Sequence, residues 1–512
     1  MTSFGLPLLW GMLLGSLASA QQPDPPELIW EDNSLGNYYQ YGAQVAWIGD
    51  VDGDATDDFA VSSPGVKKVE VFSGSTKSEI ARVNGGVRFG HSLASIGDVN
   101  GDGIPDFAAG TPYTNSNKGE VKVISGADFS ELYVLNGNYA SQYFGWSIAS
   151  IDDTDGDGVP DFLVHSIHQD GIVSLHSGAT GALRFEIFAQ AQWEDFGEGM
   201  AGIHDYNNDG AADFLAGAPG GISGGLVILF SGVDGATLST LQNTGSEGFG
   251  ASIAMIGDIN ADAIPDFVIG APTTPRLGSI GVGEARIYNG SNLTQLRSHS
   301  GNSAGQRFGQ LVAAAGDYDQ DGIPDYLIAS PDGDPNGITN AGKVELYSGV
   351  NAAVIGLIAG TQSFENLPSS MAGIGDGHRD LVPDFLIGSA NHGSSEGGRV
   401  QMWGAPSPWL QVHNLVAGST ATLSAHPCQP GGTVQFWMSR FGDGPSYTIF
   451  GPVLLDRPFI FIGASTVPIP GLAELEVYIP LPLAGATLHC QGLELRPNGS
   501  KRLTTGITRQ VQ

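Results

Sequence analysis

A phrase of eleven residues recurs seven times along this chain, and this repeat constrains the fold more than any other feature of the sequence. In the second copy the phrase reads GDVNGDGIPDF and spans residues 97–107. Self-similarity at a period of roughly fifty residues indicates an array of one supersecondary unit. The other copies start at Gly49, Asp152, His204, Gly257, Gly316 and Gly375.

Each copy lies inside a longer unit that predicts several short strands. An aromatic-Gly pair, such as Phe89-Gly90, comes first, and a short alternating stretch leads from it into the acidic phrase. After the phrase come an apolar run that ends in a GAP-like turn, as in FVIGAP, and a third run that closes on Gly, as in GEARIYNG. Runs of this length and composition, bounded by Gly, Pro and Asn, are typical of antiparallel strands. In the seventh unit the pair is altered and reads Phe364-Glu365.

The two ends of the array complement each other. A fourth strand follows in most units, as in residues 131–145, but the last unit has none before the Pro-rich APSPW. The segment at 27–42 leads into the pair Tyr41-Gly42 just as the fourth strands lead into the other pairs. We therefore expect a closing strand at about 27–32. Closure into a ring protects sheet edges, so the predicted fold is all-β, with a seven-bladed β-propeller over residues 21–405.

The segment 406–512 breaks the period and lacks acidic loops. Its strand-like runs, separated by Pro and Gly, predict a separate small β-sandwich domain. Cys428 and Cys490 are the only cysteines of the chain, and both fall in this segment. In an exported protein two such thiols most simply form one disulfide, and the alternative is two buried free thiols.

The first twenty residues are typical of a signal peptide. They combine an apolar core with a small-residue site at Ala18-Ser19-Ala20, ahead of a polar, Pro-rich start. The usual basic residues before the core are missing, and the alternative is a single membrane anchor. We predict a signal peptide at 1–20 and an exported protein, whether secreted, periplasmic or on the cell surface, with no membrane span after the signal is removed.

The recurring phrase places oxygen-bearing side chains at alternate positions of a short loop. Counted from Asp98 in the second copy, they stand at positions 1, 3, 5 and 9, with a backbone carbonyl available at position 7 and Gly103 at position 6. Ca²⁺ accepts six to eight such oxygens at variable angles, whereas Zn²⁺ prefers nitrogen and sulfur ligands. An EF-hand would need flanking helices and Glu at position 12, where this copy has Ala109. The phrase therefore predicts a calcium loop on a β-hairpin.

The alternative is that Asp, Asn and Gly merely mark polar turns. Seven copies in one register argue against it, because a turn alone does not demand an acid at position 9. The seven loops are numbered one to seven in chain order. The candidate metal ligands, with residue 7 of a loop acting through its carbonyl, are Asp50, Asp52, Asp54, Thr56 and Asp58; Asp98, Asn100, Asp102, Ile104 and Asp106; Asp153, Asp155, Asp157, Val159 and Asp161; Asp205, Asn207, Asp209, Ala211 and Asp213; Asp258, Asn260, Asp262, Ile264 and Asp266; Asp317, Asp319, Asp321, Ile323 and Asp325; and Asp376, Asp380 and Asp384.

The charge of the chain agrees with metal loops. It holds 53 Asp and Glu against 21 Lys and Arg, for a net charge of −32, and 24 of these acids stand at positions 1, 3, 5 and 9 of the loops. Nucleic acid is excluded as a partner, because its binding needs a basic footprint. The predicted cofactor is Ca²⁺, up to seven ions, which would bring the charge to −18.

Loop composition predicts an order of affinity. Loops three and six have carboxylates at all four positions and Gly at position 6, so we expect them to bind most tightly. Loop seven departs most, with His378 at position 3, Arg379 beside the site and Leu381 at position 6, where a left-handed turn disfavours a bulky side chain. We expect loop seven to be the weakest site.

The combination of Phe-Gly, an Asp-x-Asp/Asn-x-Asp loop and Gly-Ala-Pro resembles the FG-GAP repeat family, known from the propeller heads of integrin α-subunits. The resemblance covers about residues 27–404, and the segment after it resembles the small β-domain of some exported bacterial proteins. The resemblance to the FG-GAP repeat family implies a calcium-stabilised extracellular propeller used for adhesion or recognition. Integrins carry calcium loops on only some blades, whereas every unit of this chain has a candidate.

Three function classes stay open from the sequence. The leading one is a binding module that recognises an extracellular protein or glycan through propeller loops, and the others are a structural spacer of the cell envelope and a polysaccharide lyase or hydrolase. We predict no enzyme and no catalytic residue, because every carboxylate pair belongs to a repeated loop, and nucleophile motifs, P-loops and Rossmann fingerprints are absent. His165, His168 and His176 share one unit and could suggest a metal or base site, but their loop and strand spacing is more typical of surface or hydrogen-bonded histidines.

The structure can separate these classes. An exposed aromatic cluster on one face would favour the binding module, with Trp146, Trp193 and Trp403 as the first candidates. An acidic pair outside all seven loops, lining a cleft, would favour the enzyme.

Overall fold

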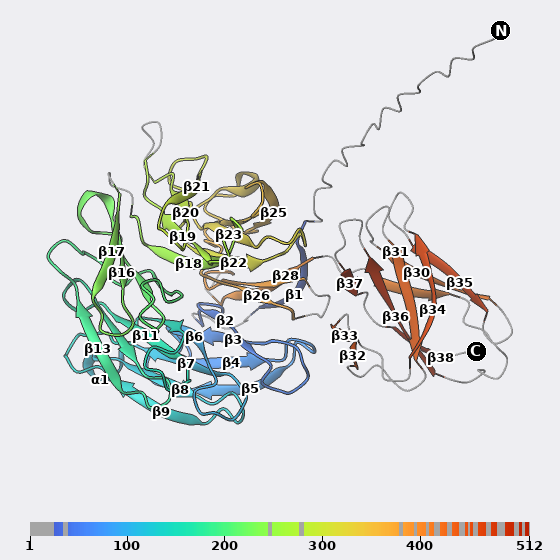
Figure 1. Cartoon of the computed structure of the whole chain (residues 1–512), viewed down its shortest axis with the longest axis horizontal. Helices are drawn as coiled ribbons and strands as arrows, with labels where there is room; N and C mark the ends of the chain where they lie inside the picture. Colours follow the sequence, from blue (N-terminus) through green and yellow to red (C-terminus); the bar gives the residue numbers. More distant parts are fainter. Residues whose placement is uncertain are drawn as a thin grey trace, which may run out of the picture.

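The computed structural model describes residues 25–33, 39–243, 248–275, 281–377, 382–393 and 397–405, together with the backbone of the strands beyond residue 405. Between Glu27 and Gly404 the strands form seven four-stranded antiparallel sheets. These sheets are arranged around a common centre as the blades of a propeller (Figure 1). The prediction of a seven-bladed β-propeller is confirmed.

Each blade takes four strands in chain order, except the seventh. Blades one to four contain β2 (Val45–Gly49), β3 (Asp58–Ser63), β4 (Lys68–Phe72) and β5 (Glu79–Asn84); β6 (Ser92–Gly97), β7 (Asp106–Thr111), β8 (Glu120–Ile124) and β9 (Glu131–Asn136); β10 (Ser147–Ile151), β11 (Asp161–Ser166), β12 (Ile172–His176) and β13 (Leu183–Phe188); and β14 (Met200–Gly202), β15 (Phe214–Ala218), β16 (Leu226–Phe230) and β17 (Thr237–Gln242). Blades five to seven contain β18 (Ser252–Gly257), β19 (Asp266–Ala271), β20 (Glu284–Tyr288) and β21 (Gln295–Ser300); β22 (Val312–Gly316), β23 (Asp325–Ser330), β24 (Lys343–Tyr347) and β25 (Val354–Ala359); and β26 (Ser370–Gly375), β27 (Asp384–Ser389), β28 (Arg399–Gly404) and β1 (Glu27–Asn33).

Within a blade, the burial of each strand agrees with its amino-acid sequence. The second strand, such as β7 with the sequence DFAAGT, is buried along its whole length because neighbouring blades cover both of its faces. A strand buried on both faces has a continuous apolar run, as these strands do. The fourth strand lies at the outer edge, and in β9 its residues are half-buried or exposed. Helix is nearly absent from the described residues: α1 (Thr114–Asn117) and three short 3₁₀ turns lie in loops.

The ring closes through the N-terminal segment. Strand β1 pairs antiparallel with β28, which places a strand from one end of the array at the edge of the last blade. The first strands of the blades contact one another in sequence, and β26 contacts β2 to complete the circle. Together they line a central cavity of about 410 Å³, with Trp47, Met200 and Met255 among its walls.

The aromatic-Gly pairs join each blade to the preceding one. Phe144 is buried, and its backbone bridges Gly119 of the preceding blade; Tyr41, Phe249 and Phe308 make the same kind of bridge. In the seventh unit the bridge to Gly342 is made by Leu367, which is fully buried. The assignment of Phe364-Glu365 as the altered pair is therefore wrong: Phe364 is 63% exposed, and an aliphatic side chain fills the site of the ring.

Beyond residue 405 the chain forms β-structure of a different kind. One sheet joins β29 (Trp409–His413), β30 (Thr420–His426) and β35 (Ala473–Tyr478), and β32 (Ser446–Thr448) pairs with β33 (Gly451–Val453). A second sheet joins β34 (Phe459–Thr466), β31 (Thr433–Ser439), β36 (Thr487–Leu495), β37 (Lys501–Leu503) and β38 (Ile507–Gln510). The two sheets contact each other, as in a small sandwich.

Several predictions lie outside the described residues. These are the signal peptide at 1–20, Cys428, and the side chain of Cys490, whose backbone lies in β36. The disulfide and the boundaries at 20, 405 and 406 stay predictions. Among the described helices, none has the length and apolar character needed to span a membrane.

Candidate metal-binding loops and the opposite face

The seven acidic loops all join the first strand of a blade to the second, and they therefore share one face of the propeller. In loop two, the carboxylate of Asp98 at position 1 accepts hydrogen bonds from the backbone N–H groups of Gly101 at 2.7 Å and Gly103 at 2.8 Å. Asn100 and Asp102 each accept one from the residue two positions later, at 2.9 Å. These bonds hold the oxygens of positions 1, 3 and 5 on a tightly curled loop.

The acid at position 9 is buried and holds the loop to its own blade. Asp106 accepts hydrogen bonds from the N–H of Val99 in the loop and of Gly126, in the turn after the third strand, at 2.9 Å each. The same two bonds recur in the other five of loops one to six. This acid therefore has a structural role that the sequence argument for calcium did not consider. The seven acids at position 9, all 0% exposed, are Asp58, Asp106, Asp161, Asp213, Asp266, Asp325 and Asp384.

Burial of these carboxylates disfavours their charged form. Desolvation raises the pKa of Asp58 to about 6 and that of Asp325 to about 8, and it outweighs the hydrogen bonds that favour the charge. Neighbouring acids of the same loop add to the repulsion. A cation within the loop would offset both effects.

Three loops bring carboxylate oxygens close enough to share one ion. In each, one oxygen from positions 1, 3 and 9 lies within 4.8 Å of the others: Asp50, Asp52 and Asp58; Asp153, Asp155 and Asp161; Asp317, Asp319 and Asp325. Loops two, four and five carry Asn at position 3, which supplies an amide oxygen in place of the third carboxylate. A donor set made only of oxygens fits Ca²⁺ and does not fit Zn²⁺.

The turn at position 6 tolerates more than glycine. Its backbone is left-handed in loops one to six, with φ of 89° at Gly103 but also 66° at Ala55 and 70° at Ala263. An Ala there bears the steric cost that Gly avoids. The chain nevertheless keeps the same turn in loops one and five, so the local strain is compensated by the rest of the loop.

Loop seven differs from the others in its surroundings. Asp376 and Asp384 are described, whereas Asp380 lies in the part of the loop that the structure does not describe. The backbone N–H of Gly377 donates to Asp384 at 2.7 Å, so the position-9 bond to the loop is kept. The Nζ of Lys77, from blade one, donates to the carbonyl of Gly377 at 2.5 Å. A positive charge from the first blade therefore lies beside the last loop, where the ring closes.

The opposite face carries an aromatic cluster at the junction of blades two and three. His91, Tyr113, Tyr143 and Trp146 are half-buried, and their rings contact one another with centroids 4.5 Å apart for His91 and Trp146 and 5.5 Å for the two tyrosines. Burial, together with the nearby Arg88, lowers the pKa of His91 to about 4, so the cluster is uncharged at neutral pH. Beside it, the exposed Tyr139 stacks on His168.

The sequence pointed to only part of this cluster. Trp146 is one of the candidates, but Trp193 is buried against Phe196 and Phe230, and Trp403 packs against the core shared by blades six and seven. The signal that could have found the rest is positional: His91 and Trp146 each directly follow an aromatic-Gly pair, and such residues share one face of the ring.

The three histidines of unit three do not form a common site. His165 is buried, with neither ring nitrogen assigned a hydrogen-bond partner, and burial lowers its pKa to about 3. His176 stacks on Phe162 and contacts Ser174 at 3.1 Å. His168, which stacks on Tyr139, and His176 fit the predicted surface and hydrogen-bonded histidines, whereas the buried His165 is of neither kind.

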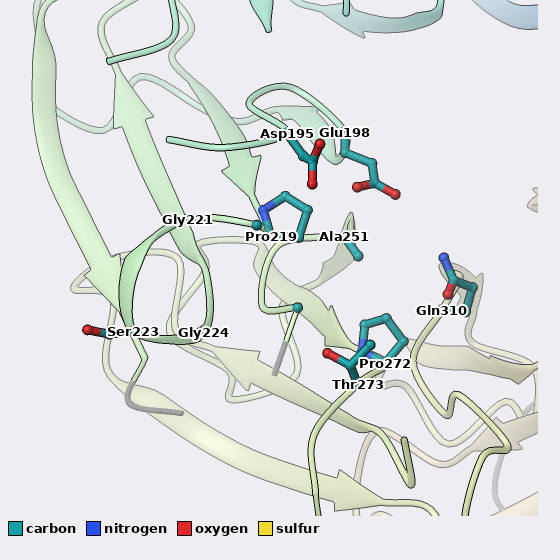
Figure 2. A pocket seen from close by; sticks show the side chains of 12 residues that line it. Asp195, Glu198, Pro219, Gly221, Ser223, Gly224, Ala251, Pro272, Thr273 and Gln310 are labelled. Carbon is teal, nitrogen blue, oxygen red and sulfur yellow. The ribbon is translucent and has the colours of Figure 1, made fainter. Parts of the chain in front are cut away.

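A pocket of about 530 Å³ opens on the same face as the aromatic cluster, over blades four to six. Asp195 and Glu198 lie on one side of it, and Pro272, Thr273 and Gln310 lie across from them (Figure 2). Glu198 reaches solvent inside this concave surface, but desolvation and the nearby Asp195 raise its pKa to about 7. This acidic pair stands outside all seven loops, and the sequence analysis did not identify it.

Part of the repeat array is similar to proteins that are already known. Residues 89–124 match the family model described as the FG-GAP repeat. The chain is 32% identical to integrin alpha-V of Gallus gallus over 206 residues, which are 36% of this chain and 19% of that protein. It is 29% identical to integrin alpha-5 of Xenopus laevis over 237 residues, 42% of this chain and 22% of that protein. The chain thus spans about a fifth of the length of these curated relatives.

Proposed function

We propose that this chain, a seven-bladed β-propeller that matches the FG-GAP repeat over residues 89–124 and is similar in part to integrin alpha chains, is an exported, calcium-stabilised binding module that recognises an extracellular protein or glycan. The metal would be held by the acidic loops on one face. The partner would be held by the loops of the opposite face. Because the two functions would lie on different faces, the recognition loops could vary in sequence while the metal loops keep each blade in place.

The observation that carries the proposal is the aromatic cluster of His91, Tyr113, Tyr143 and Trp146. Aromatic rings supply large contact areas at little cost in conformational entropy, and they are enriched where proteins bind partners. These rings come from loops of two adjacent blades, they remain half-exposed, and they are uncharged at neutral pH. A spacer has no need for such a surface.

The test is a binding experiment on extracellular material, with calcium and with chelator. Trp146→Ala, Tyr113→Ala and a matched control at the buried Trp193, replaced by Phe, would be compared with the unchanged protein. We expect the first two variants to retain the melting temperature within a few degrees and to lose roughly tenfold or more in affinity, as for contact residues at the centre of an interface. If Trp146→Ala and Tyr113→Ala bind as tightly as the unchanged protein, or if no calcium-dependent partner is found, the structural spacer is favoured.

The pocket with Asp195 and Glu198 favours a second candidate, a hydrolase acting on polysaccharide. A carboxyl group with a pKa near 7 beside a second acid is the pair that general acid catalysis uses. Against it, the other described lining residues are mostly Gly, Pro and Ala, and none of them is an aromatic residue on which a sugar ring could stack. Release of reducing ends that is abolished in Glu198→Gln would establish the enzyme, and no release from a broad polysaccharide panel would exclude it for that panel.

A further inference from the structure

Arg184 stands at a position that is aliphatic in the other described blades. In the first six blades the fourth strand bulges at its second residue, where the pairing with the third strand shifts register. The residue at this bulge turns toward the blade interior and packs beside the acidic loop. In the other five blades it is Ile80, Leu132, Leu238, Leu296 or Ile355.

The guanidinium of Arg184 reaches into loop three. Its Nη1 lies 3.2 Å from Oδ2 of Asp155 at position 3 and 3.8 Å from Oδ2 of Asp161 at position 9. These two acids belong to the group of three whose oxygens lie close enough to share a metal ion. The side chain of Arg184 is 20% exposed and that of Asp155 25%, whereas Asp161 is fully buried, so the guanidinium extends from the blade surface to a buried carboxylate.

A second substitution in the same loop accompanies the arginine. Position 2 is occupied by Thr154, where loops one, two, four, five and six have Val, Val, Tyr, Ile and Tyr. The hydroxyl of Thr154 donates to Asp161, and Nη1 of Arg184 lies 3.2 Å from that hydroxyl oxygen. At these two positions blade three therefore has polar residues where blades one, two, four, five and six have aliphatic or aromatic ones, and both contact acids that would bind an ion.

We propose that Arg184 is the internal cation of loop three: it holds this loop closed without a metal ion, and calcium enters only by displacing the guanidinium. The inference rests on the proposed role of the other loops as calcium sites. The physical reason is that Asp161 is fully buried beside two other acids, an arrangement that needs a positive charge. Arg supplies one that is always present, because its guanidinium does not deprotonate in proteins.

The inference reverses one prediction from loop composition. With four carboxylates and Gly158 at position 6, loop three is expected from sequence to be one of the two tightest sites. Displacement of an ion-paired guanidinium adds a cost that loop six, with Ile355 at the same bulge, does not have. A coupling of this kind is worth roughly 5- to 100-fold in affinity. We therefore expect loop three to bind calcium more weakly than loop six.

The test replaces Arg184 with Leu, the residue that three other blades carry at this bulge. Calcium titration of the full chain should show one site that becomes roughly 5- to 100-fold tighter in Arg184→Leu. Adding Asp157→Ala should remove the gained site in the Leu background. In the unchanged protein Asp157→Ala should remove only a weak site. In chelator, Arg184→Leu should melt lower than the unchanged protein, and saturating calcium should restore it.

Arg82→Leu is the matched control, because it removes the same charge from the fourth strand of blade one without reaching a loop. It should leave every calcium site unchanged. Identical titrations of Arg184→Leu and the unchanged protein, or a melt in chelator that the substitution does not lower, would overturn the role of Arg184. If the unchanged protein binds no calcium at any loop, the proposed function fails instead, and the two failures are distinct.

Discussion

The buried aspartate at position 9 explains why each loop is tied to its blade whether or not an ion is present. Asp106 accepts N–H groups from the loop and from the turn after the third strand, and it is fully buried. Asp102, at position 5 of the same loop, is exposed and accepts the N–H of Ile104. One loop thus contains an acid needed for folding and an acid needed mainly for the ion.

The two acids should differ most when no calcium is present. Asp106→Ala leaves two buried N–H groups without their acceptor and should lower the free energy of unfolding by roughly 2–4 kcal/mol in chelator, and by more in calcium, because the loop also loses a candidate ligand. Asp102→Ala should cost less than about 1 kcal/mol in chelator, because its bond is solvent-exposed, and more in calcium. Urea unfolding of both variants under the two conditions measures this. Equal losses for the two residues in chelator would contradict the assignment.

Buried histidines should make the propeller sensitive to acid. The pKa of His165 is about 3 in the folded protein and about 6.5 in an unfolded chain, so the unfolded state binds the proton more readily. Its contribution to stability is therefore complete above about pH 6.5 and is lost as the pH falls toward 3. At pH 5, His165→Leu should retain roughly 2 kcal/mol more of its neutral-pH stability than the unchanged protein does. Parallel losses in the two proteins between pH 7 and 5 would contradict this.

The sequence predicts residues within a loop better than residues that meet across a blade. The spacing of acids predicts oxygens that lie together within a loop, because the ligands are neighbours in the chain, and in loops one, three and six the oxygens of positions 1, 3 and 9 do so. Arg184 lies 23 residues beyond Asp161 and was missed, because it is recognised only when the fourth strands of the blades are aligned. Apart from Trp146, the residues of the aromatic cluster were missed for the same reason: Tyr113 and Trp146 meet only because two blades are adjacent.

At the scale of elements, blade seven depends on a strand from the other end of the array. Strand β1 pairs with β28, and a polar network strengthens this edge: Glu31 accepts from Arg399 at 3.3 Å and from Gln401 at 2.8 Å. Arg399 also donates to the buried Glu365, which in turn contacts His392 at 3.1 Å. The sequence suggested the closing strand from the missing fourth run, but the network could not be inferred, because Glu31 lies 368 residues from Arg399 and 370 residues from Gln401.

Glu365 and Glu31 should differ in how much they contribute to the free energy of unfolding. Glu365→Ala leaves Arg399 buried without its closest partner and should cost roughly 3–5 kcal/mol of unfolding free energy. Glu31→Ala removes a partly exposed partner and should cost about 1 kcal/mol or less. Thermal or urea unfolding of the two variants measures the difference. A larger loss for Glu31→Ala would show that closure depends on the strand edge and not on the buried pair.

At the scale of the whole molecule, the ring joins two kinds of surface. One face carries the acidic loops, whose positions 1, 3, 5 and 9 hold 24 of the 53 acids of the chain, and the other carries the aromatic cluster and the pocket. The repeat predicts this division well, because seven copies in one register place equivalent loops on the same face. The residues that a partner would contact on the second face are single departures from the repeat. The sequence hardly distinguishes them from residues with a structural role.

The central claim, that calcium stabilises the propeller, is tested most directly by the melting temperature of the full chain in millimolar calcium and in chelator. A site filled at about 100 times its dissociation constant contributes roughly 2.7 kcal/mol. Several such sites should raise the melting temperature by many degrees, and magnesium at the same concentration should raise it much less. An identical melting temperature in calcium and in chelator would contradict the account and leave the acidic loops as polar turns.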